Sequence, residues 1–170
     1  KWWLTQLESE QAQVLETLTV ETELSVAITL MVALPKGNGF DDIIRYSTEL
    51  GVTCIAPLLS DRTLLNPSPQ KLERWRRIAT EAAEQSERAF VPTILEPVSF
   101  MTAINASQAT HRYICEGRGD YPHLNSLVKT DIPEIIIATG PEGGWTEPEI
   151  ENAIASGFQP VSLGRRILRA

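Results

Sequence analysis

The chain has 170 residues, of which 42% are hydrophobic and 22% are charged, and this predicts one domain, or one domain plus a fragment of another. Such a composition supports a packed core and excludes an intrinsically disordered chain. The formal net charge of −7 argues against a protein that binds nucleic acid through bulk positive charge. No run approaches the roughly 18 apolar residues of a membrane-spanning helix, so we expect no membrane partner.

Two cysteines, Cys54 and Cys115, lie far apart in the sequence. They are too few for a disulfide framework, and they fit a reduced protein better than a secreted one. The chain also lacks a charged segment followed by an apolar run of the kind that directs export. We therefore expect a cytoplasmic protein.

The first 24 residues differ from the rest of the chain. Residues 13–21 alternate in part and are rich in Val, Leu and Thr, which is typical of a strand. A single strand is not stable alone, so we interpret residues 1–24 as the end of an all-β domain, with a strand of the main domain as the alternative. Because the chain begins at Lys1 and ends at Ala170 without a tail, we expect a fragment of a longer protein.

From Ser25 onward, apolar runs of strand length alternate with helical patterns. The runs predict strands over 26–34, 52–58, 111–115, 134–138 and 158–163, and the patterns predict helices over 40–50, 70–86, 99–106 and 146–156. Gly51 stands where a helix C′ glycine belongs, and Thr146 with Glu149 forms a capping box. The repeated β-α-β spacing predicts an α/β fold with a mostly parallel sheet covered by helices.

Two of these helices have a clear apolar face. In the first helix this face holds Phe40, Ile43, Ile44 and Leu50. In the long helix the face consists of residues at helical spacing, namely Leu72, Trp75, Ile78, Ala79, Ala82 and Ala83. We expect both faces to pack on the sheet.

A glycine-rich loop, Gly140-Pro141-Glu142-Gly143-Gly144, follows the most apolar strand. Ligands of open α/β sheets bind beyond the carboxyl ends of strands, and glycines let a backbone approach a ligand closely. The loop is neither a GxGxxG fingerprint nor a P-loop, and Glu142 suits a sugar hydroxyl or a cation better than a phosphate. A simple strand-to-helix turn is the alternative.

A second candidate segment, Leu163-Gly164-Arg165-Arg166-Ile167-Leu168-Arg169, also follows a strand. Its three arginines could hold an anion or a nucleic-acid phosphate. The alternative is a solvated basic turn. Ile167 and Leu168 favour a segment that folds back against the body of the protein.

Together these segments resemble the signature motifs of a known family, the RsmE-like branch of the SPOUT methyltransferases, which methylate N3 of a uridine in 16S ribosomal RNA. The family's glycine motif matches Gly140 to Gly144, and its Leu-Gly-x-Arg-Ile-Leu-Arg motif matches Leu163 to Arg169, with Arg165 at the variable position. Also family-like are Glu49 to Val52, Ser60-Asp61-Arg62 and the segment 82–92. The resemblance covers about residues 25–170.

This resemblance implies an α/β fold with a C-terminal trefoil knot, a rare exception to the rule against knotted chains. It implies that residues 1–24 are the remnant of an N-terminal PUA-like β-barrel, and that residues 25–170 are the methyltransferase domain without its C-terminal helix. It also implies S-adenosylmethionine as cofactor, with no metal. The residues implied to bind the cofactor are Cys115, Glu116, Thr139, Gly140, Glu142, Gly143, Gly144, Leu163, Gly164, Ile167 and Leu168.

The partners implied by the resemblance are 16S ribosomal RNA or the small ribosomal subunit, and a second copy of the chain in a homodimer. For catalysis we hypothesise that Arg166 or Arg169 stabilises charge that develops on uridine O2 or O4. Glu142 is a conceivable base, but a cofactor or loop-ordering role is favoured. His111 and His123 are expected to be structural, because no metal-ligand spacing joins them.

Three interpretations stay open beside this one. The arginines of the long helix, Arg74, Arg76 and Arg77, together with Arg88, could face RNA or form a solvated face with the interleaved glutamates. The whole chain could instead be a nucleotide-binding oxidoreductase with a doubly wound sheet, although it lacks GxGxxG. It could also be an RNA-binding module without catalysis.

Overall fold

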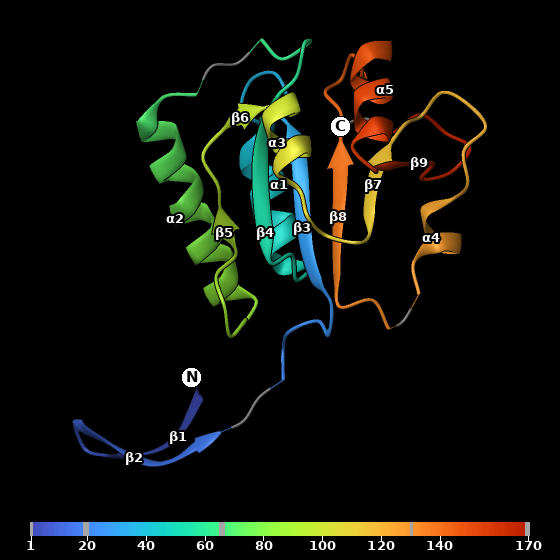
Figure 1. The fold of residues 1–170 in the computed structure, drawn as a ribbon. Coiled ribbons are helices and arrows are strands. Elements are labelled where there is room, and N and C mark those ends of the chain that lie inside the picture. Colours follow the sequence, from blue (N-terminus) through green and yellow to red (C-terminus); the bar gives the residue numbers. More distant parts are fainter. Residues whose placement is uncertain (1, 19–20, 65–66, 130, 169–170) are drawn as a thin grey trace.

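The computed structural model describes residues 2–18, 21–64, 67–129 and 131–168. Its main body is a parallel sheet with helices on both faces (Figure 1). The strands of this sheet are β3 (Ala27–Ala33), β4 (Cys54–Leu59), β5 (Thr93–Ile94), β6 (Val98–Ser99), β7 (Arg112–Cys115), β8 (Glu134–Thr139) and β9 (Gln159–Val161). The helices are α1 (Gly39–Glu49), α2 (Pro69–Gln85), α3 (Phe100–Ala106), α4 (Leu124–Leu127) and α5 (Glu147–Ala155). The predicted α/β class is thereby confirmed.

The strand order is β5-β4-β3-β8-β7-β9, and β6 also pairs with β4. Every pairing in this sheet is parallel, so the carboxyl ends of the strands lie at one edge. The chain passes from β3 outward to β4 and later returns on the other side of β3 with β8. A reversal of this kind between neighbouring strands is where open α/β sheets form ligand clefts.

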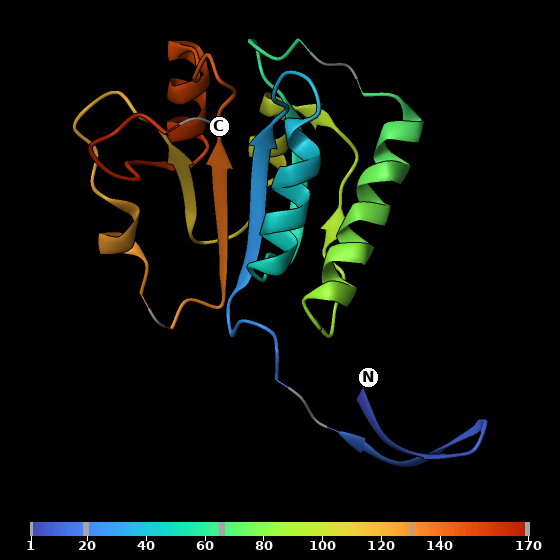
Figure 2. The ribbon, with the colours of Figure 1, turned by 180° about the vertical axis from the view of Figure 1, so that it is seen from behind.

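Helices α1 and α2 cover one face of the sheet, and α3 and α5 cover the other (Figures 1 and 2). Between the sheet and α1 and α2, Trp75 packs on Phe40 with ring centroids 4.5 Å apart. All six residues predicted for the apolar face of α2 are buried. The sequence pattern of this helix therefore placed its packing face correctly.

Leu50 is a correction, because its side chain is 75% exposed. It occupies the C-cap of α1, and the chain turns there through Gly51, whose φ is +97°. The turn points Leu50 to solvent and brings the next residue, Val52, into the core instead. Gly51 is suited to the turn because a left-handed backbone disfavours a side chain.

Residues 2–18 form a separate hairpin of β1 (Trp2–Glu8) and β2 (Gln11–Leu18), which pair antiparallel. Among the described residues β2 pairs with β1 and not with the main sheet, contrary to the alternative of a main-domain strand. Side chains 4–17 are all exposed, and the hairpin lies apart from the α/β body (Figure 1). No helix in the described ranges is long and apolar enough to cross a membrane.

The segment that leads into the main sheet is held by a partly buried ion pair. Arg88, with a side chain 4% exposed, contacts the Glu23 carboxylate at 2.5 Å. Arg88 Nη1 donates to the carbonyls of Thr48 and Val52, each at 2.9 Å. The hydrogen bonds from Arg88 hold the pKa of Glu23 below its ordinary value. The guanidinium thus ties the incoming chain to the ends of α1 and α2 and to the start of β4.

This pair predicts a pH-dependent contribution to stability. A carboxyl whose folded pKa is lowered stabilises the fold above its unfolded pKa of about 4.3, and that stabilisation is lost as the pH falls through the folded pKa. The variant Glu23→Gln should therefore lower the free energy of unfolding by a constant amount above about pH 5, and the difference from wild type should shrink below about pH 4.3. Urea unfolding at a series of pH values measures it. Glu81→Gln, in an exposed pair, is the control, and a difference that persists undiminished at pH 3 would contradict the assignment.

Candidate functional site

A cleft of about 1610 Å³ lies at the carboxyl edge of the sheet, beyond β3, β7, β8 and β9. It exceeds the roughly 300–1,000 Å³ of common ligand pockets, so a cofactor and part of a second substrate could share it. All eleven residues predicted to bind the cofactor line this cleft: Cys115, Glu116, Thr139, Gly140, Glu142, Gly143, Gly144, Leu163, Gly164, Ile167 and Leu168. Arg166 lines it as well, whereas Arg169 lies outside the described residues.

The glycine loop presents open backbone to the cleft. The Gly144 amide donates to the Pro141 carbonyl at 2.8 Å, which closes a tight turn, and Gly144 has a φ of +71°. No atom lies within 4 Å of the place where a Cβ would stand on Gly144, and the same holds for Gly164, with a φ of +134°. Both residues adopt the left-handed backbone that favours glycine, and beside both there is space that a ligand could fill.

Three hydrogen bonds hold the glycine loop and the adjoining Trp145 to other parts of the chain. The Lys36 amide, after β3, donates to Glu142 Oε1 at 3.0 Å. The Arg62 guanidinium, after β4, donates to the Gly143 carbonyl. The Trp145 indole donates at 3.1 Å to the carbonyl of Cys115, at the end of β7. The loop after β8 is therefore fixed to the ends of three other strands.

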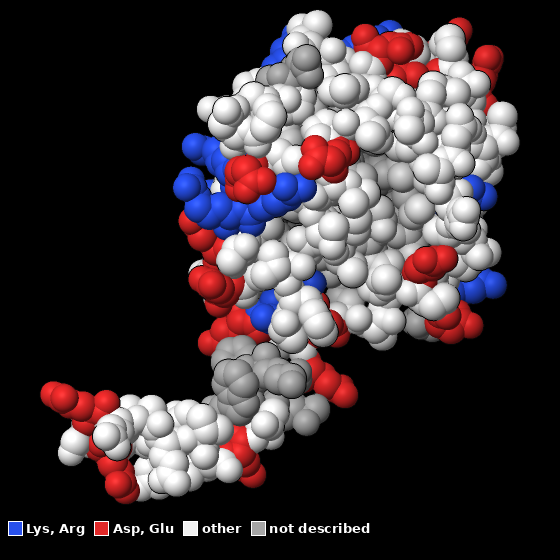
Figure 3. Space-filling model, turned by 60° about the vertical axis from the view of Figure 1, so that its left-hand side comes forward, with Lys and Arg blue, Asp and Glu red and all other residues white. Residues whose placement is uncertain are grey.

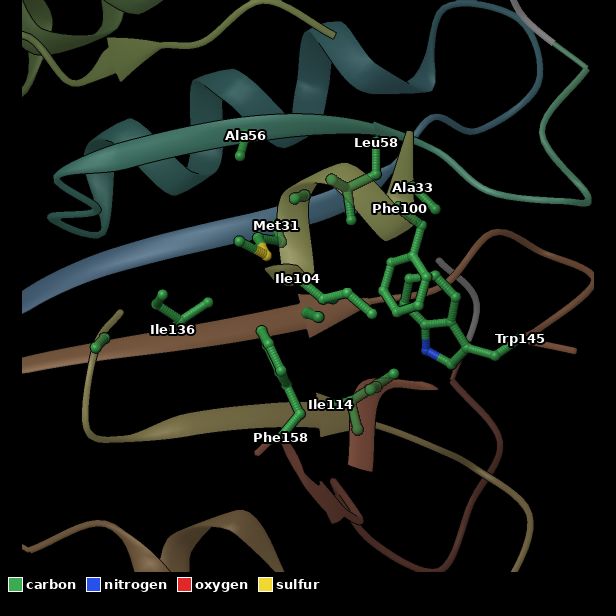
Figure 4. Packing of buried hydrophobic residues seen from close by; sticks show 14 residues of the cluster. Met31, Ala33, Ala56, Leu58, Phe100, Ile104, Ile114, Ile136, Trp145 and Phe158 are labelled. Atoms are coloured by element: carbon green, nitrogen blue, oxygen red, sulfur yellow. The ribbon is translucent and has the colours of Figure 1, made fainter. Parts of the chain in front are cut away.

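Trp145 was not among the residues that the sequence indicated. Its side chain is 6% exposed and stacks against Phe100 with ring centroids 4.5 Å apart, as Figure 4 shows. A Cβ on Gly140 would come within 3.1 Å of the indole, so a side chain at this position would have to displace Trp145 slightly. A tryptophan that directly follows a glycine loop was the available sign of this packing.

Helix α5 starts directly after the loop, and the predicted capping box holds its first turn. The Thr146 hydroxyl accepts from the Glu149 amide, and the Glu149 carboxylate accepts from the Thr146 amide at 2.8 Å. Glu149 is buried, and the amide of Asp61 donates to its other oxygen at 2.9 Å. The start of the helix is thereby joined to the loop after β4.

The arginine segment lies beside the loop that follows β7. Val161 accepts from the Glu116 amide at 3.0 Å, and Ser162 bonds Pro122 and Leu124 on its other side. The segment runs from there into the cleft, where Ile167 and Leu168 are 74% and 59% exposed. The segment thus lies along the cleft, as a fold-back against the body would place it, but the two apolar side chains stay largely exposed.

Three arginines line the cleft, namely Arg62, Arg118 and Arg166. None of them forms a salt bridge with another described residue. Sequence reasoning singled out Arg166 but assigned no role to the other two, which lie in separate loops. Guanidinium groups that are free of carboxylates suit an anionic or carbonyl-bearing substrate.

The two histidines lie elsewhere. His123 caps α4, where its Nδ1 accepts from the Asn125 amide at 3.1 Å, and neither His123 nor His111 lines the cleft. Within the described ranges, no three His, Cys, Asp or Glu side chains are grouped as metal ligands.

The arginines of α2 are neutralised. Arg74 pairs with Asp41 at 2.8 Å, Arg76 with Glu73 and Glu96, and Arg77 with Glu81. Figure 3 shows that acidic side chains are interspersed with the largest group of basic side chains on this side of the molecule. Since each of these three arginines has an acidic partner, the interpretation as a solvated helix face is favoured over a phosphate-binding surface.

Comparison with known proteins agrees with this site. Residues 22–170 match the family model described as an RNA methyltransferase domain. The chain is 54% identical over 163 residues to ribosomal RNA small subunit methyltransferase E of Synechocystis sp., covering 94% of this chain and 54% of that protein. It is 32% identical over 168 residues to the Bacillus subtilis protein of the same name, covering 92% of this chain and 65% of that protein.

A solved structure of ribosomal RNA small subunit methyltransferase E from Neisseria gonorrhoeae, bound to S-adenosyl methionine, superposes with a TM-score of 0.84. It is 34% identical, and the match covers 93% of this chain and 66% of that one. The chain thus spans between about half and two thirds of the length of these relatives.

The parallel sheet with its cleft and the family match define an RNA methyltransferase domain. Within that class, the chain belongs to the RsmE-like family of SPOUT methyltransferases, as the two motifs indicated. These findings do not favour the oxidoreductase alternative.

Burial predicts an unreactive thiol in the cleft wall. Desolvation raises the pKa of Cys115 to about 11, so almost none of it is thiolate at pH 8. In a Cys54→Ser variant, where Cys115 is the remaining cysteine, we expect a disulfide reagent to react at least tenfold more slowly with folded than with urea-unfolded protein. Absorbance of the released thiol follows the reaction. Equal rates in the two states would show that the thiol is exposed.

Proposed function

We propose that this protein transfers the methyl group of S-adenosylmethionine to N3 of a uridine in 16S ribosomal RNA. The observation that carries the proposal is the meeting of both motif loops on one cleft, where all eleven predicted cofactor residues lie. Membership of the RsmE-like family and the cofactor bound to the Neisseria gonorrhoeae protein support it.

The residues of the cleft fit such a cofactor. The open space beside Gly144 and Gly164 lets a ligand approach the main chain closely. Leu163, Ile167 and Leu168 supply the apolar surface that an adenine ring requires. When bound, S-adenosylmethionine supplies an electrophilic methyl group, so the protein has to orient the uridine and stabilise charge.

Uridine N3 carries a proton at neutral pH, and its removal leaves negative charge on O2 and O4. Arg166 lines the cleft, forms no salt bridge with another described residue, and is assigned to stabilise that charge. Arg169 retains the same proposed role from the motif alone. Glu142 already accepts the Lys36 amide, which supports a loop-ordering role for this residue over that of a base.

The remaining architecture is proposed from the family. The segment 161–162 lies between residue 116 on one side and residues 122–124 on the other, an arrangement compatible with the trefoil knot. Residues 1–24 are assigned to the end of a PUA-like barrel, residues 25–170 to the methyltransferase domain, and the active protein to a cytoplasmic homodimer that acts on the small ribosomal subunit. The separate, exposed hairpin supports the first assignment.

The decisive experiment is methyl transfer by the protein at its natural length. With labelled S-adenosylmethionine and small-subunit particles that lack the modification, we expect one labelled nucleotide, which mass spectrometry identifies as N3-methyluridine. Naked 16S ribosomal RNA serves as the second substrate. Binding of RNA with no transfer to either substrate would favour the non-catalytic RNA-binding module.

The role of Arg166 is tested by Arg166→Ala. Loss of a preorganised donor to developing charge should lower kcat by about 10²–10³-fold, with little change in the affinity for S-adenosylmethionine. Arg165→Ala is the matched control, because Arg165 is the adjacent arginine but does not line the cleft. Full methyl transfer by Arg166→Ala with an unchanged KM for RNA would remove Arg166 from the catalytic assignment.

A further inference from the structure

The short loop after β4, residues 60–63, contacts the glycine loop and the start of α5 although neither motif includes it. Its Arg62 is 81 residues from Gly143 in sequence, and it reaches the loop after β8 across the end of β3, the strand between β4 and β8. Three separate contacts join it to the wall of the cleft. They come from the Arg62 side chain, the Asp61 side chain and the Asp61 amide.

The Arg62 contact has a polar and an apolar part. The guanidinium donates to the Gly143 carbonyl. The aliphatic part of the side chain lies so close to Gly143 that a Cβ there would come within 3.1 Å of Arg62 Cδ. Arg62 therefore fixes both the direction of this carbonyl and the position of the backbone, and the peptide plane also carries the amide of Gly144.

Asp61 contacts the first turn of α5, which directly follows the glycine loop. Its amide donates to Glu149 Oε1 at 2.9 Å, and its carboxylate lies 3.1 Å from the Thr146 hydroxyl. That hydroxyl has one proton and lies 3.1 Å from Glu149 as well, so it donates to one carboxylate at a time. These bonds fix the first turn of α5 relative to the loop after β4.

The loop after β4 is itself preorganised. The Ser60 amide donates to the Thr63 hydroxyl at 3.1 Å, the two hydroxyls lie 2.9 Å apart, and the Thr63 amide donates to the Ser60 carbonyl at 2.9 Å. Ser60 is buried. A turn closed by its own hydrogen bonds can hold Arg62 in position without help from a ligand.

We propose that Arg62 is a positioning residue: by holding the Gly143 carbonyl it keeps the glycine loop in the conformation that forms the wall of the S-adenosylmethionine cleft. The inference rests on the proposed function, since it concerns the cofactor of that reaction. Ordering the loop before binding removes the entropic cost of ordering it afterwards, and the gain is measured as cofactor affinity. Arg62 acts through Gly143, and RNA is not its ligand.

The test compares Arg62→Met, Arg62→Lys and a control, Arg77→Ala, in the protein at its natural length. Methionine keeps an aliphatic chain but no donor, lysine keeps a charged donor group, and Arg77 is an exposed arginine that does not line the cleft. By calorimetry we expect Arg62→Met to weaken S-adenosylmethionine binding about tenfold, which is the loss of one charge-assisted hydrogen bond. Arg62→Lys should recover binding to within about threefold, and Arg77→Ala should match wild type.

A second measurement does not depend on the cofactor. In the free protein the Gly144 amide bonds the Pro141 carbonyl, and its hydrogen exchange reports the order of the loop. Exchange at Gly144 should accelerate about tenfold in Arg62→Met and stay unchanged in Arg77→Ala. A purely global loss of stability would accelerate exchange in the β3 and β8 core as well, and that result would overturn the proposal.

The outcomes separate this inference from the proposed function. If wild type fails to bind S-adenosylmethionine, the proposed function is wrong, while the exchange rates still decide whether Arg62 orders the loop. If Arg62→Met binds the cofactor normally but loses affinity for 16S ribosomal RNA, Arg62 is a substrate contact and the positioning role is wrong. Unchanged exchange at Gly144 would also overturn it.

Discussion

The arrangement of the cleft depends on how the loop between β8 and α5 is held. Glycines make this loop open to a ligand, but they also deprive it of side chains that could fix its conformation. The fixing groups come instead from the ends of β3, β4 and β7, through the Lys36 amide, the Arg62 guanidinium and the Cys115 carbonyl. Each strand end contributes one hydrogen bond, so the loop conformation depends on the correct parallel alignment of four strands.

This alignment is a product of the core. The rings of Phe100 and Trp145 stack where β8 gives way to the loop, and Ile114 and Phe158 complete the same cluster (Figure 4). Trp145 belongs both to this core and to the wall of the cleft. Packing on the α3 and α5 side of the sheet is thereby coupled through Trp145 to the geometry of the cleft.

Long, periodic elements could be predicted from the sequence, because burial on one or both faces leaves a regular pattern. Helix α2 and strand β8 are examples. The two-residue strands β5 and β6 and the single turn of α4 are too short to show a period. Pairing with β4, which is distant in sequence, defines the two strands. The motif loops indicated eleven residues of the cleft, whereas Arg62, Arg118 and Trp145 were missed. The contacts of Arg62 and Trp145 span 81 and 30 residues, and a local pattern carries no record of such partners.

The partly buried pair of Glu23 and Arg88 lies at the edge of the sheet where the strands begin, opposite the cleft. The chain therefore enters the α/β body at one end of β3, while the cleft lies at the other end, seven residues and about 20 Å away. An RNA that touched both the N-terminal hairpin and the cleft would have to run along the full height of the body. The length of β3 thus sets the separation between the point where the chain enters the body and the cleft, and the ion pair fixes that point of entry.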